Sequence, residues 1–350
     1  MNSSKLKILV VGDGRSNIHE VPLSEAFEKI GIDTYRFFWG RFYESNFYLI
    51  KRILKALDKY QFSPYLFIIN FLFLTRIIAI QPCLIFIYRP THILKFSLFL
   101  SKFFIKDIRI FIYNNDDPFS KNYEKNIWKN FFRIVEFADL IFCYRKKNIN
   151  DFKEINITNT EILKPWFIPE RHFPMADFRK NKKLDVVFIG HFEDDNRLEV
   201  LEEIKKTGIN LGIYGPPYEW NHILENSTFL KDLSPVRLIW EEEYSQVINS
   251  SKIALCFLSK LNNDEYTRRN LEIPACGTAQ LSEYSEELGN MFQEGEEILF
   301  FKDASDAINK INYLLGDQKK LDDLSIKGNL RVLKDEQDII SRAKFIVSKL

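Results

Sequence analysis

One short supersecondary pattern occurs twice in the chain, once near the start of each half. Residues 6–12 are an apolar run that ends in glycine, a helical pattern closed by another glycine follows, and residues 33–38 are again strand-like. The second copy consists of the apolar run 184–190, a helical stretch over 197–207 and a strand over 209–214. Apolar runs of this kind are typical of strands buried on both faces of a parallel sheet. The repeat predicts an α/β fold of two doubly wound, Rossmann-like domains.

The domain boundaries follow from length and from the spacing of prolines. Later strands are expected at 83–88, 108–113, 140–144, 236–240, 253–258, 279–281 and 298–301. The chain has 350 residues, and about 150 residues per domain suggests two domains. Residues 166–183 are the expected linker between an N-terminal domain (1–165) and a C-terminal domain (184–317). The helical residues 318–350 are candidates for packing back on the first domain. Two such domains would face each other across a cleft, with ligands at the carboxyl ends of their strands.

Composition and charge favour a cytoplasmic protein. The four cysteines lie among apolar neighbours without a CxxC pair, which indicates reduced thiols and argues against a zinc site. No signal peptide is expected, and no uncharged apolar stretch reaches the roughly 18–20 residues of a membrane span. Residues 1–165 hold 25 Lys and Arg against 16 Asp and Glu, a net charge of +9, and the remainder carries −8. Such asymmetry favours an anionic surface or substrate for the basic half, although charge that simply differs between domains explains it equally well.

Residues 45–106 alternate aromatic and aliphatic clusters with lysine and arginine and contain a single acid, Asp58. The stretch 95–106 places large apolar side chains between lysines, as an interfacial helix does. One hypothesis is that this segment attaches the protein to an anionic membrane surface at the inner face of the cell membrane. The alternative is a core helix whose lysines extend to water at its edge. No nucleic-acid partner is expected.

The most informative segment is residues 263–277, NDEYTRRNLEIPACG. It resembles the group-one glycosyltransferases of the GT-B fold, and specifically the branch named after the spore maturation protein CgeB. That branch carries a T-x-R-x-F-E-I-P-A-x-G signature, which Thr267, Arg269, Glu272 and Gly277 match here, with Leu in the place of Phe. The resemblance implies a GT-B glycosyltransferase that moves a sugar from a nucleoside-diphosphate donor to a hydroxyl acceptor. Synthesis of surface polysaccharide, lipopolysaccharide or a related glycan is the setting that it implies, with no cofactor and no metal.

The resemblance also implies roles for individual residues of the C-terminal half. Glu272 would accept hydrogen bonds from the two ribose hydroxyls, because its two oxygens match their spacing. Arg269 and Arg197 would neutralise the pyrophosphate as it leaves. Asp264 stands eight positions before Glu272, as in the paired-acid E-x7-E motif of the related retaining family-four enzymes, but with Asp in place of the first Glu. Further donor-binding candidates are Gly190, His191, Tyr214, Gly215, Thr267 and Gly277.

Candidates for the acceptor side and for catalysis lie in the N-terminal half. The turn at Asp116 and Asp117 resembles the D-D-P turn of the CgeB branch, and either carboxylate could contact the acceptor or act as base. The turn is also a good structural turn, and its spacing is wrong for a DxD metal motif. His92 is a further catalytic candidate because it follows a predicted strand.

The glycine turn Gly12-Asp13-Gly14 lacks the third glycine of a dinucleotide fingerprint, so it is assigned to a phosphate or to the acceptor and not to a nicotinamide cofactor. Two other functions remain open: a nucleotide-sugar epimerase of the same fold, and a GT-B subunit that binds without catalysis.

Overall fold

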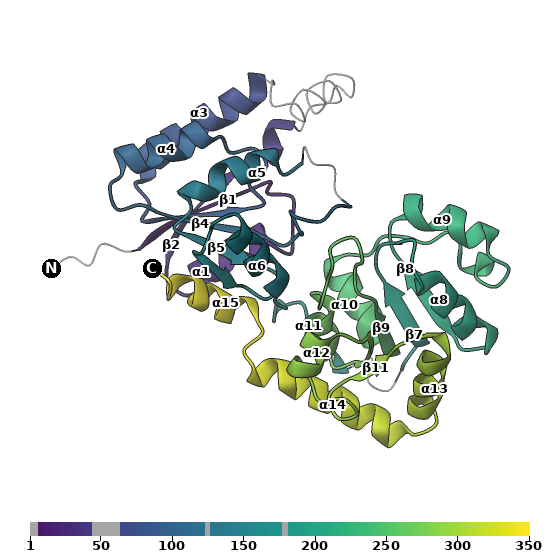
Figure 1. Cartoon of the computed structure of the whole chain (residues 1–350). Helices are drawn as coiled ribbons and strands as arrows, with labels where there is room; N and C mark the ends of the chain where they lie inside the picture. Colours follow the sequence, from purple (N-terminus) through teal and green to yellow (C-terminus); the bar gives the residue numbers. More distant parts are fainter. Residues whose placement is uncertain (1–5, 44–63, 123–126, 177–180) are drawn as a thin grey trace. The chain divides into compact units, whose positions relative to one another are not determined.

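The computed structural model describes residues 6–43, 64–122, 127–176 and 181–350. Contacts within the chain divide it into two units (Figure 1). Unit 1 consists of residues 1–164 together with 339–350, and unit 2 of residues 165–338. In the part of the chain that the model describes, no helix combines the length and the apolar character needed to cross a membrane.

Unit 1 is built on a parallel sheet with the strand order β2-β1-β3-β4-β5-β6. Its strands are β1 (Lys7–Gly12), β2 (Asp33–Phe38), β3 (Leu84–Tyr88), β4 (Arg109–Asn114), β5 (Leu140–Cys143) and β6 (Thr160–Ile162). The α-helices among its described residues are α1 (Glu20–Lys29), α3 (Pro64–Ile80), α4 (Lys95–Phe104), α5 (Lys129–Ile134), α6 (Lys146–Glu154) and α15 (Ile339–Val347). All five residues of β3 are buried, as the apolar run predicted, because helices cover both faces of the sheet.

Unit 2 repeats this plan with a parallel sheet in the order β11-β10-β9-β7-β8. Its strands are β7 (Leu184–Ile189), β8 (Leu211–Tyr214), β9 (Ser251–Cys256), β10 (Ala279–Glu283) and β11 (Leu299–Phe301). Its helices are α8 (Arg197–Lys206), α9 (Pro217–Asn226), α10 (Glu241–Asn249), α11 (Arg269–Ala275), α12 (Glu286–Met291), α13 (Ala304–Leu315) and α14 (Gln318–Lys334). Val186 and Phe188 of β7 pack in one core with α8, and Val187 packs in another with Ile273 of α11. Both faces of the sheet are therefore covered, which is the doubly wound arrangement.

The predicted strand at 236–240 is wrong. Val236 and Ile239 are buried, but no ladder forms in this stretch, which is irregular backbone. Isolated hydrogen bonds hold it, among them one from Gly215 N to Arg237 O (3.2 Å) and one from Val236 N to Asn221 Oδ1 (2.9 Å). An apolar pattern alone does not distinguish a strand from an extended loop that buries two side chains.

The C-terminal segment 318–350 is divided between the units. Helix α14 packs against α11 and β10 in unit 2, whereas α15 packs against α1 in unit 1. The first residues of the expected linker are also packed: Phe167 is 1% exposed, and its N–H donates to Gln337 O at 3.2 Å.

Each sheet has one topological switch point. In unit 1 the chain places β2 on one side of β1 and β3 on the other, and in unit 2 it places β8 on one side of β7 and β9 on the other. At such a point the loops leaving the carboxyl ends of two adjacent strands diverge and open a crevice, which is the usual ligand position in open parallel sheets. The residues after β1 and β3, and those after β7 and β9, are therefore the places to look for function.

Candidate functional site

A hollow of about 430 Å³ lies at the switch point of unit 1. Its lining comes from the segment after β1, from the end of β3 and the residues that follow it, and from two further positions: Asp13, Arg15, Ser16, Ile18, His19, Glu20, Tyr88, Arg89, Thr91, Trp39 and Asn115. His19 stacks on Tyr88 with ring centroids 4.8 Å apart, and the Tyr88 hydroxyl donates to Asn115 Oδ1 at 2.7 Å. A hollow with aromatic walls and a few fixed polar groups is the usual form of a small-molecule site.

Glu20, the first residue of α1, is the most unusual side chain of this hollow. It is fully buried, and its Oε1 accepts hydrogen bonds from the backbone N–H of Gly14 (2.7 Å) and of Ser16 (3.4 Å). Its Oε2 is buried and has no hydrogen-bond partner among the described residues. Burial raises the pKa of the Glu20 carboxyl, and the backbone hydrogen bonds oppose that rise only in part. Sequence reasoning missed this residue.

The glycine turn before Glu20 is shaped by close contacts. A Cβ on Gly12 would lie 2.9 Å from Glu20 Cγ, so the glycine leaves room for the carboxyl side chain. Gly14 has φ +83°, and a Cβ there would lie 2.3 Å from Cβ of Phe38. Asp13 Oδ1 accepts from Arg15 Nε at 2.7 Å. The assignment of Gly12, Asp13 and Gly14 to a phosphate or acceptor stays a prediction, and the turn does border the hollow.

The two predicted carboxylates of unit 1 lie beside the hollow and do not line it. Asp117 is fully buried, and its Oδ1 accepts from Phe119 N (3.0 Å) and Asn148 Nδ2 (2.7 Å). These are the contacts of a carboxylate that fixes its own turn against α6. Asp116 Oδ2 lies 2.5 Å from Arg89 NH2, and Arg89 does line the hollow.

The third predicted catalytic residue of unit 1, His92, is half-buried and also lies outside the lining. Its ring stacks on Trp39 at 5.4 Å, and its Nδ1 is 2.8 Å from Thr91 Oγ1. The catalytic roles assigned to Asp116, Asp117 and His92 stay predictions. Glu20 is an acidic group that lines the hollow and has an oxygen without a hydrogen-bond partner in the described part of the chain.

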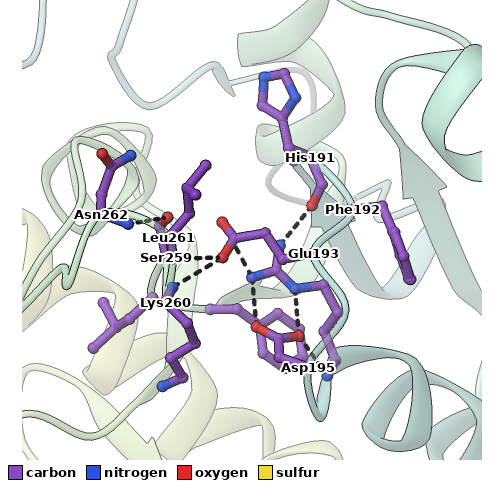
Figure 2. Close-up of polar contacts among 12 residues, drawn as sticks. His191, Phe192, Glu193, Asp195, Ser259, Lys260, Leu261 and Asn262 are labelled. Atoms are coloured by element: carbon purple, nitrogen blue, oxygen red, sulfur yellow. Dashed lines mark hydrogen bonds and ion pairs between the residues drawn. The ribbon is translucent and has the colours of Figure 1, made fainter. Parts of the chain in front are cut away.

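In unit 2, the loops after β7 and β9 are tied together at the switch point (Figure 2). The carboxylate of Glu193, in the β7 loop, reaches the turn after β9. Its Oε2 accepts from the backbone N–H of Lys260 (2.9 Å) and of Leu261 (3.2 Å). Asn262 N donates to Ser259 Oγ at 3.2 Å and closes that turn. These hydrogen bonds therefore hold the β7 loop and the β9 turn together at the switch point of unit 2.

Arg197 holds the β7 loop from its other end. Its guanidinium is almost fully buried and forms a two-pronged pair with Asp195, at 2.7 Å from Nε to Oδ1 and 2.8 Å from NH2 to Oδ2. Its NH1 donates to His191 O at 2.6 Å. The positive charge of Arg197 is thus compensated inside the loop. Its contact with a pyrophosphate stays a prediction, while the structure shows it as the anchor of the loop.

Two glycines allow the ends of β7 and β8 to approach each other. Gly190 N donates to Tyr214 O at 2.9 Å, and a Cβ on Gly215 would lie only 2.3 Å from Gly190 O. Trp220 Nε1 donates to the same carbonyl at 2.9 Å. Arg269 reaches this point, because its NH2 would lie 3.4 Å from a Cβ built on Gly190. Arg269 is therefore the cation of the motif that borders the end of β7.

Gly215→Ala should destabilise the chain by about 1–3 kcal/mol, because the new methyl group overlaps a backbone oxygen. A urea unfolding curve measures this loss. Gly289→Ala is the matched control: Gly289 lies in α12, its Cβ would meet Tyr284 only at an ordinary 3.4 Å, and alanine is the better helix former. Equal midpoints for the two variants would contradict the close approach of β7 and β8.

The remaining donor candidates lie around the same edge. His191 is exposed, and its Nδ1 lies 3.0 Å from both carboxylate oxygens of Glu219. The ring of Tyr214 lies under the guanidinium of Arg237, 5.7 Å from its centroid. Asp264 N donates to Ser259 O at 2.9 Å in the turn that follows β9. These positions fit the predicted donor side, and their roles stay predictions.

The motif at residues 263–277 contains the whole of helix α11. Thr267 Oγ1 accepts from Arg269 N at 3.1 Å, and Thr267 N donates to Asn270 Oδ1 at 2.8 Å, so the two side chains cap the first turn reciprocally. Gly277, just after the helix, has φ +70°, and a Cβ there would crowd Pro174 at 3.0 Å. Thr267 and Gly277 thus set the bounds of the helix that carries Arg269 and Glu272.

Glu272 lies in a buried polar cluster. It is 1% exposed, its Oε2 accepts from the Tyr244 hydroxyl at 2.8 Å, and its Oε1 pairs with Arg268. Burial alone would raise the pKa of Glu272, but the Arg268 charge, with smaller contributions from the Tyr244 hydrogen bond and the Arg269 charge, brings it below the ordinary value. Glu272 is therefore ionised with both oxygens engaged. The contact of Glu272 with a ribose stays a prediction. It requires Tyr244 and Arg268 to share the carboxylate with the ribose hydroxyls.

His172 completes this cluster in its neutral form. Its Nδ1 accepts from Ile168 N at 2.9 Å, which leaves the proton on Nε2, 3.7 Å from Glu272 Oε1. Burial lowers the pKa of His172 to about 4, against the attraction of Glu272, so the contact is not an ion pair at neutral pH.

Stability should fall as the pH drops from about 6.5 to about 4, because the unfolded chain takes up a proton on His172 over that range and the folded chain does not. The loss is about 3 kcal/mol at 1.36 kcal/mol per pKa unit. Urea unfolding at several pH values measures it. His172→Gln keeps an acceptor for Ile168 N and should flatten this part of the profile, while His222→Gln, in α9, should not. If His172→Gln loses stability between pH 6.5 and 4 as the parent chain does, His172 is not the group responsible for that loss.

Comparisons with known proteins agree with this architecture. Residues 197–348 match the family model described as glycosyl transferase-like. The structure of Anabaena HepE in complex with UDP-glucose is similar over 98% of this chain and 99% of that one, with a TM-score of 0.69 and 11% identity. Sucrose-phosphate synthase from Thermosynechococcus elongatus is similar over 98% of both chains (TM-score 0.68, 13% identity). A glycosyltransferase from Rickettsia africae is similar over 99% and 97% (TM-score 0.66, 11% identity). No curated protein sequence matches the chain.

These likenesses confirm the predicted fold, two Rossmann-like domains of the GT-B type. The family match adds that residues 197–348 are similar to glycosyl transferase-like proteins. The CgeB-like branch stays a prediction.

Proposed function

We propose that the chain is a glycosyltransferase that moves a sugar from a nucleoside-diphosphate donor to a hydroxyl of a glycan or lipid-linked acceptor. The observation that carries the proposal is the position of Arg269, on a motif that resembles the family's donor signature, at the β7 end of the unit 2 switch point. This motif lies within the residues that match the glycosyl transferase-like family. Surface polysaccharide or lipopolysaccharide synthesis on the cytoplasmic side of the membrane is the proposed setting.

The donor is assigned to unit 2. Negative charge on the diphosphate grows as the bond to the sugar breaks, and a guanidinium already held beside the site stabilises that charge without reorganisation. Arg269 is assigned this role because it borders the end of β7, whereas Arg197 is held inside the β7 loop by Asp195. The proposal includes neither a metal nor a cofactor. Because Anabaena HepE was solved with UDP-glucose, uridine diphosphate sugars are the first donors to test.

The acceptor is assigned to the hollow of unit 1. Glu20 Oε2 offers a hydrogen-bond acceptor without a partner among the described residues, and the raised pKa of the carboxyl makes it a stronger base than an ordinary glutamate. In the proposed step the acceptor hydroxyl gives its proton to Glu20. Its oxygen bonds to the anomeric carbon, and the nucleoside diphosphate leaves with the bonding electrons. The rings of His19, Tyr88 and Trp39 would cover the apolar faces of an acceptor sugar.

A thermal-shift screen with UDP-, GDP-, dTDP- and CMP-sugars tests the donor assignment, because a ligand that binds the folded chain raises its unfolding temperature. One nucleotide class should raise the transition, with and without EDTA, and Arg269→Ala should reduce the effect. Arg331→Ala, on α14, is the matched control. The assignment fails if no nucleotide shifts the transition, or if Arg269→Ala responds as the parent chain does.

A further inference from the structure

Helix α3 is apolar around its whole circumference. Its 17 residues include one charged side chain, Arg76. One face packs into the core of unit 1 through Ile69, Phe73 and Ile77. The opposite face is exposed and carries Phe67 (63% exposed), Phe71 (67%), Ile68 and Ile78. A helix that is apolar on its outer face as well as its inner one is expected to have a second apolar surface to pack against.

Helix α4 continues this exposed face. The two helices run side by side (Figure 1), and Asn70 of α3 joins them by accepting from Leu94 N and Ser97 Oγ, both at 2.8 Å. Leu98 of α4 enters the same core as the buried side of α3, so the outer faces of both helices are turned away from one sheet face. The exposed phenylalanines of α4 are Phe96, Phe99, Phe103 and Phe104. Together with Phe67, Ile68, Phe71 and Ile78 of α3, these four phenylalanines form a surface that we call the aromatic face.

A basic hollow of about 510 Å³ adjoins the aromatic face. Leu72, Thr75, Arg76 and Ala79 of α3 line one side of it, at the i, i+3, i+4 and i+7 spacing of a single helix flank. Arg36 of β2 and Arg41 line the other side, and none of the described residues that line the hollow is acidic.

The three guanidiniums of this hollow are held in place. Arg41 lies over the ring of Phe42 at 5.0 Å and Arg76 over that of Tyr35 at 5.9 Å, while Arg36 donates to Ser24 Oγ at 2.6 Å and pairs with Glu28 at 2.9 Å. Among the described residues, Arg41 and Arg76 have no carboxylate partner. Planar guanidinium groups match the oxygens of a phosphate.

We infer that the aromatic face and the basic hollow together form a docking surface for an anionic phospholipid membrane. The phenylalanines would enter the headgroup–acyl boundary, as the apolar side of an interfacial helix does. The hollow, beside them on α3, would take the phosphate of a lipid headgroup. The combination argues for lipid over a protein partner, because Arg41 and Arg76, which have no carboxylate partner among the described residues, attract an anionic surface, and the apolar residues need hydrocarbon. Neither observation depends on sugar transfer.

Part of the sequence hypothesis for residues 45–106 lies outside the described residues, namely Lys51, Arg52, Lys55, Asp58 and Lys59. Within the described part, Lys95 pairs with Glu136 and Lys102 with Asp139, so these two lysines contribute less charge than expected. The arginines of the hollow, which the sequence did not single out as a group, carry the electrostatic part of the inference.

Sedimentation of the full chain with vesicles tests this inference. The chain should bind vesicles of phosphatidylglycerol and phosphatidylcholine, bind pure phosphatidylcholine weakly, and bind less at 0.5 M salt. Arg41→Glu/Arg76→Glu should weaken partitioning roughly 30-fold or more. Phe67→Ser/Phe71→Ser should also release the chain, since these side chains are exposed and their loss leaves the core intact. Phe229→Ser and Arg237→Glu, at exposed positions of unit 2, are the matched controls.

Three results would overturn the inference. The first is an absence of binding to phosphatidylglycerol vesicles at low salt, and the second is equal binding to the two vesicle types. The third is a dimer in sedimentation velocity that Phe67→Ser/Phe71→Ser disrupts without any effect on vesicles, which would make the face an interface between copies of the chain. Circular dichroism of each variant checks that the fold is retained.

Discussion

Arg268→Met should destabilise the chain by about 3–5 kcal/mol, because it leaves Glu272 as a buried charge without its cation. Glu272 is 1% exposed, and Arg268 is the main group that brings its pKa down against burial. Methionine retains much of the length of the arginine stem, so the loss reports on charge more than on packing. The measurement is the free energy of unfolding in urea at pH 7.

Two further variants separate the ion pair from other causes. The double variant Arg268→Met/Glu272→Gln removes both charges and should recover a large part of the lost stability. Arg237→Met changes an exposed arginine of the same unit, paired on the surface with Glu243, and should cost less than about 1 kcal/mol. A loss below 1 kcal/mol for Arg268→Met would contradict a buried, ionised Glu272.

Glu20→Gln should lower turnover by about 10²- to 10⁴-fold with little change in donor affinity. Glutamine keeps an oxygen for the N–H groups of Gly14 and Ser16 but cannot take a proton from the acceptor hydroxyl. Donor affinity should hold because Glu20 belongs to unit 1 and the proposed donor residues belong to unit 2. Steady-state rates and a donor titration measure the two effects. Glu25→Gln, at an exposed position of the same helix, should change neither.

Glu20→Gln should also change the way in which the free energy of unfolding depends on pH. Because burial raises the pKa of Glu20 above its ordinary value, the folded chain holds a proton that the unfolded chain has lost when the pH lies between the ordinary and the raised pKa. Stability of the parent chain should therefore fall as the pH rises through that interval. Glu20→Gln should lack this fall and be at least as stable as the parent at pH 7. A folded Glu20→Gln variant that keeps the turnover of the parent chain would contradict the role of Glu20 as base.

The sheets could be predicted from the sequence because burial on both faces leaves a direct trace. Strands such as 84–88 and 184–189 are short runs of apolar residues, and their register follows once each βαβ unit is recognised. The stretch 236–240 shows the limit of that signal, since two buried side chains do not make a strand. The motif that carries Arg269 and Glu272 could also be found, because its residues are consecutive.

The partners of these residues could not be predicted, because they come from distant parts of the chain. Glu272 meets Tyr244 across 28 positions and His172 across a longer separation, and neither neighbour carries a local pattern that points to it. Glu20 was missed for a related reason. Its importance depends on the space that Gly12 leaves and on the turn of backbone N–H groups that binds its Oε1, and both are features of the folded loop.

The most direct test of the central claim is whether the purified chain breaks the bond between sugar and diphosphate in a donor that it binds. Release of nucleoside diphosphate from a labelled nucleotide sugar should increase when a saccharide acceptor is added, and the label should appear in the acceptor in equal amount. Arg269→Ala should slow this release more than it weakens donor binding, because the charge that it stabilises grows in the transition state. Binding of donor without any release, over a panel of saccharide and lipid-linked acceptors, would contradict glycosyl transfer and indicate a binding subunit. Conversion of the donor to an epimer, with the diphosphate retained, would contradict it as well.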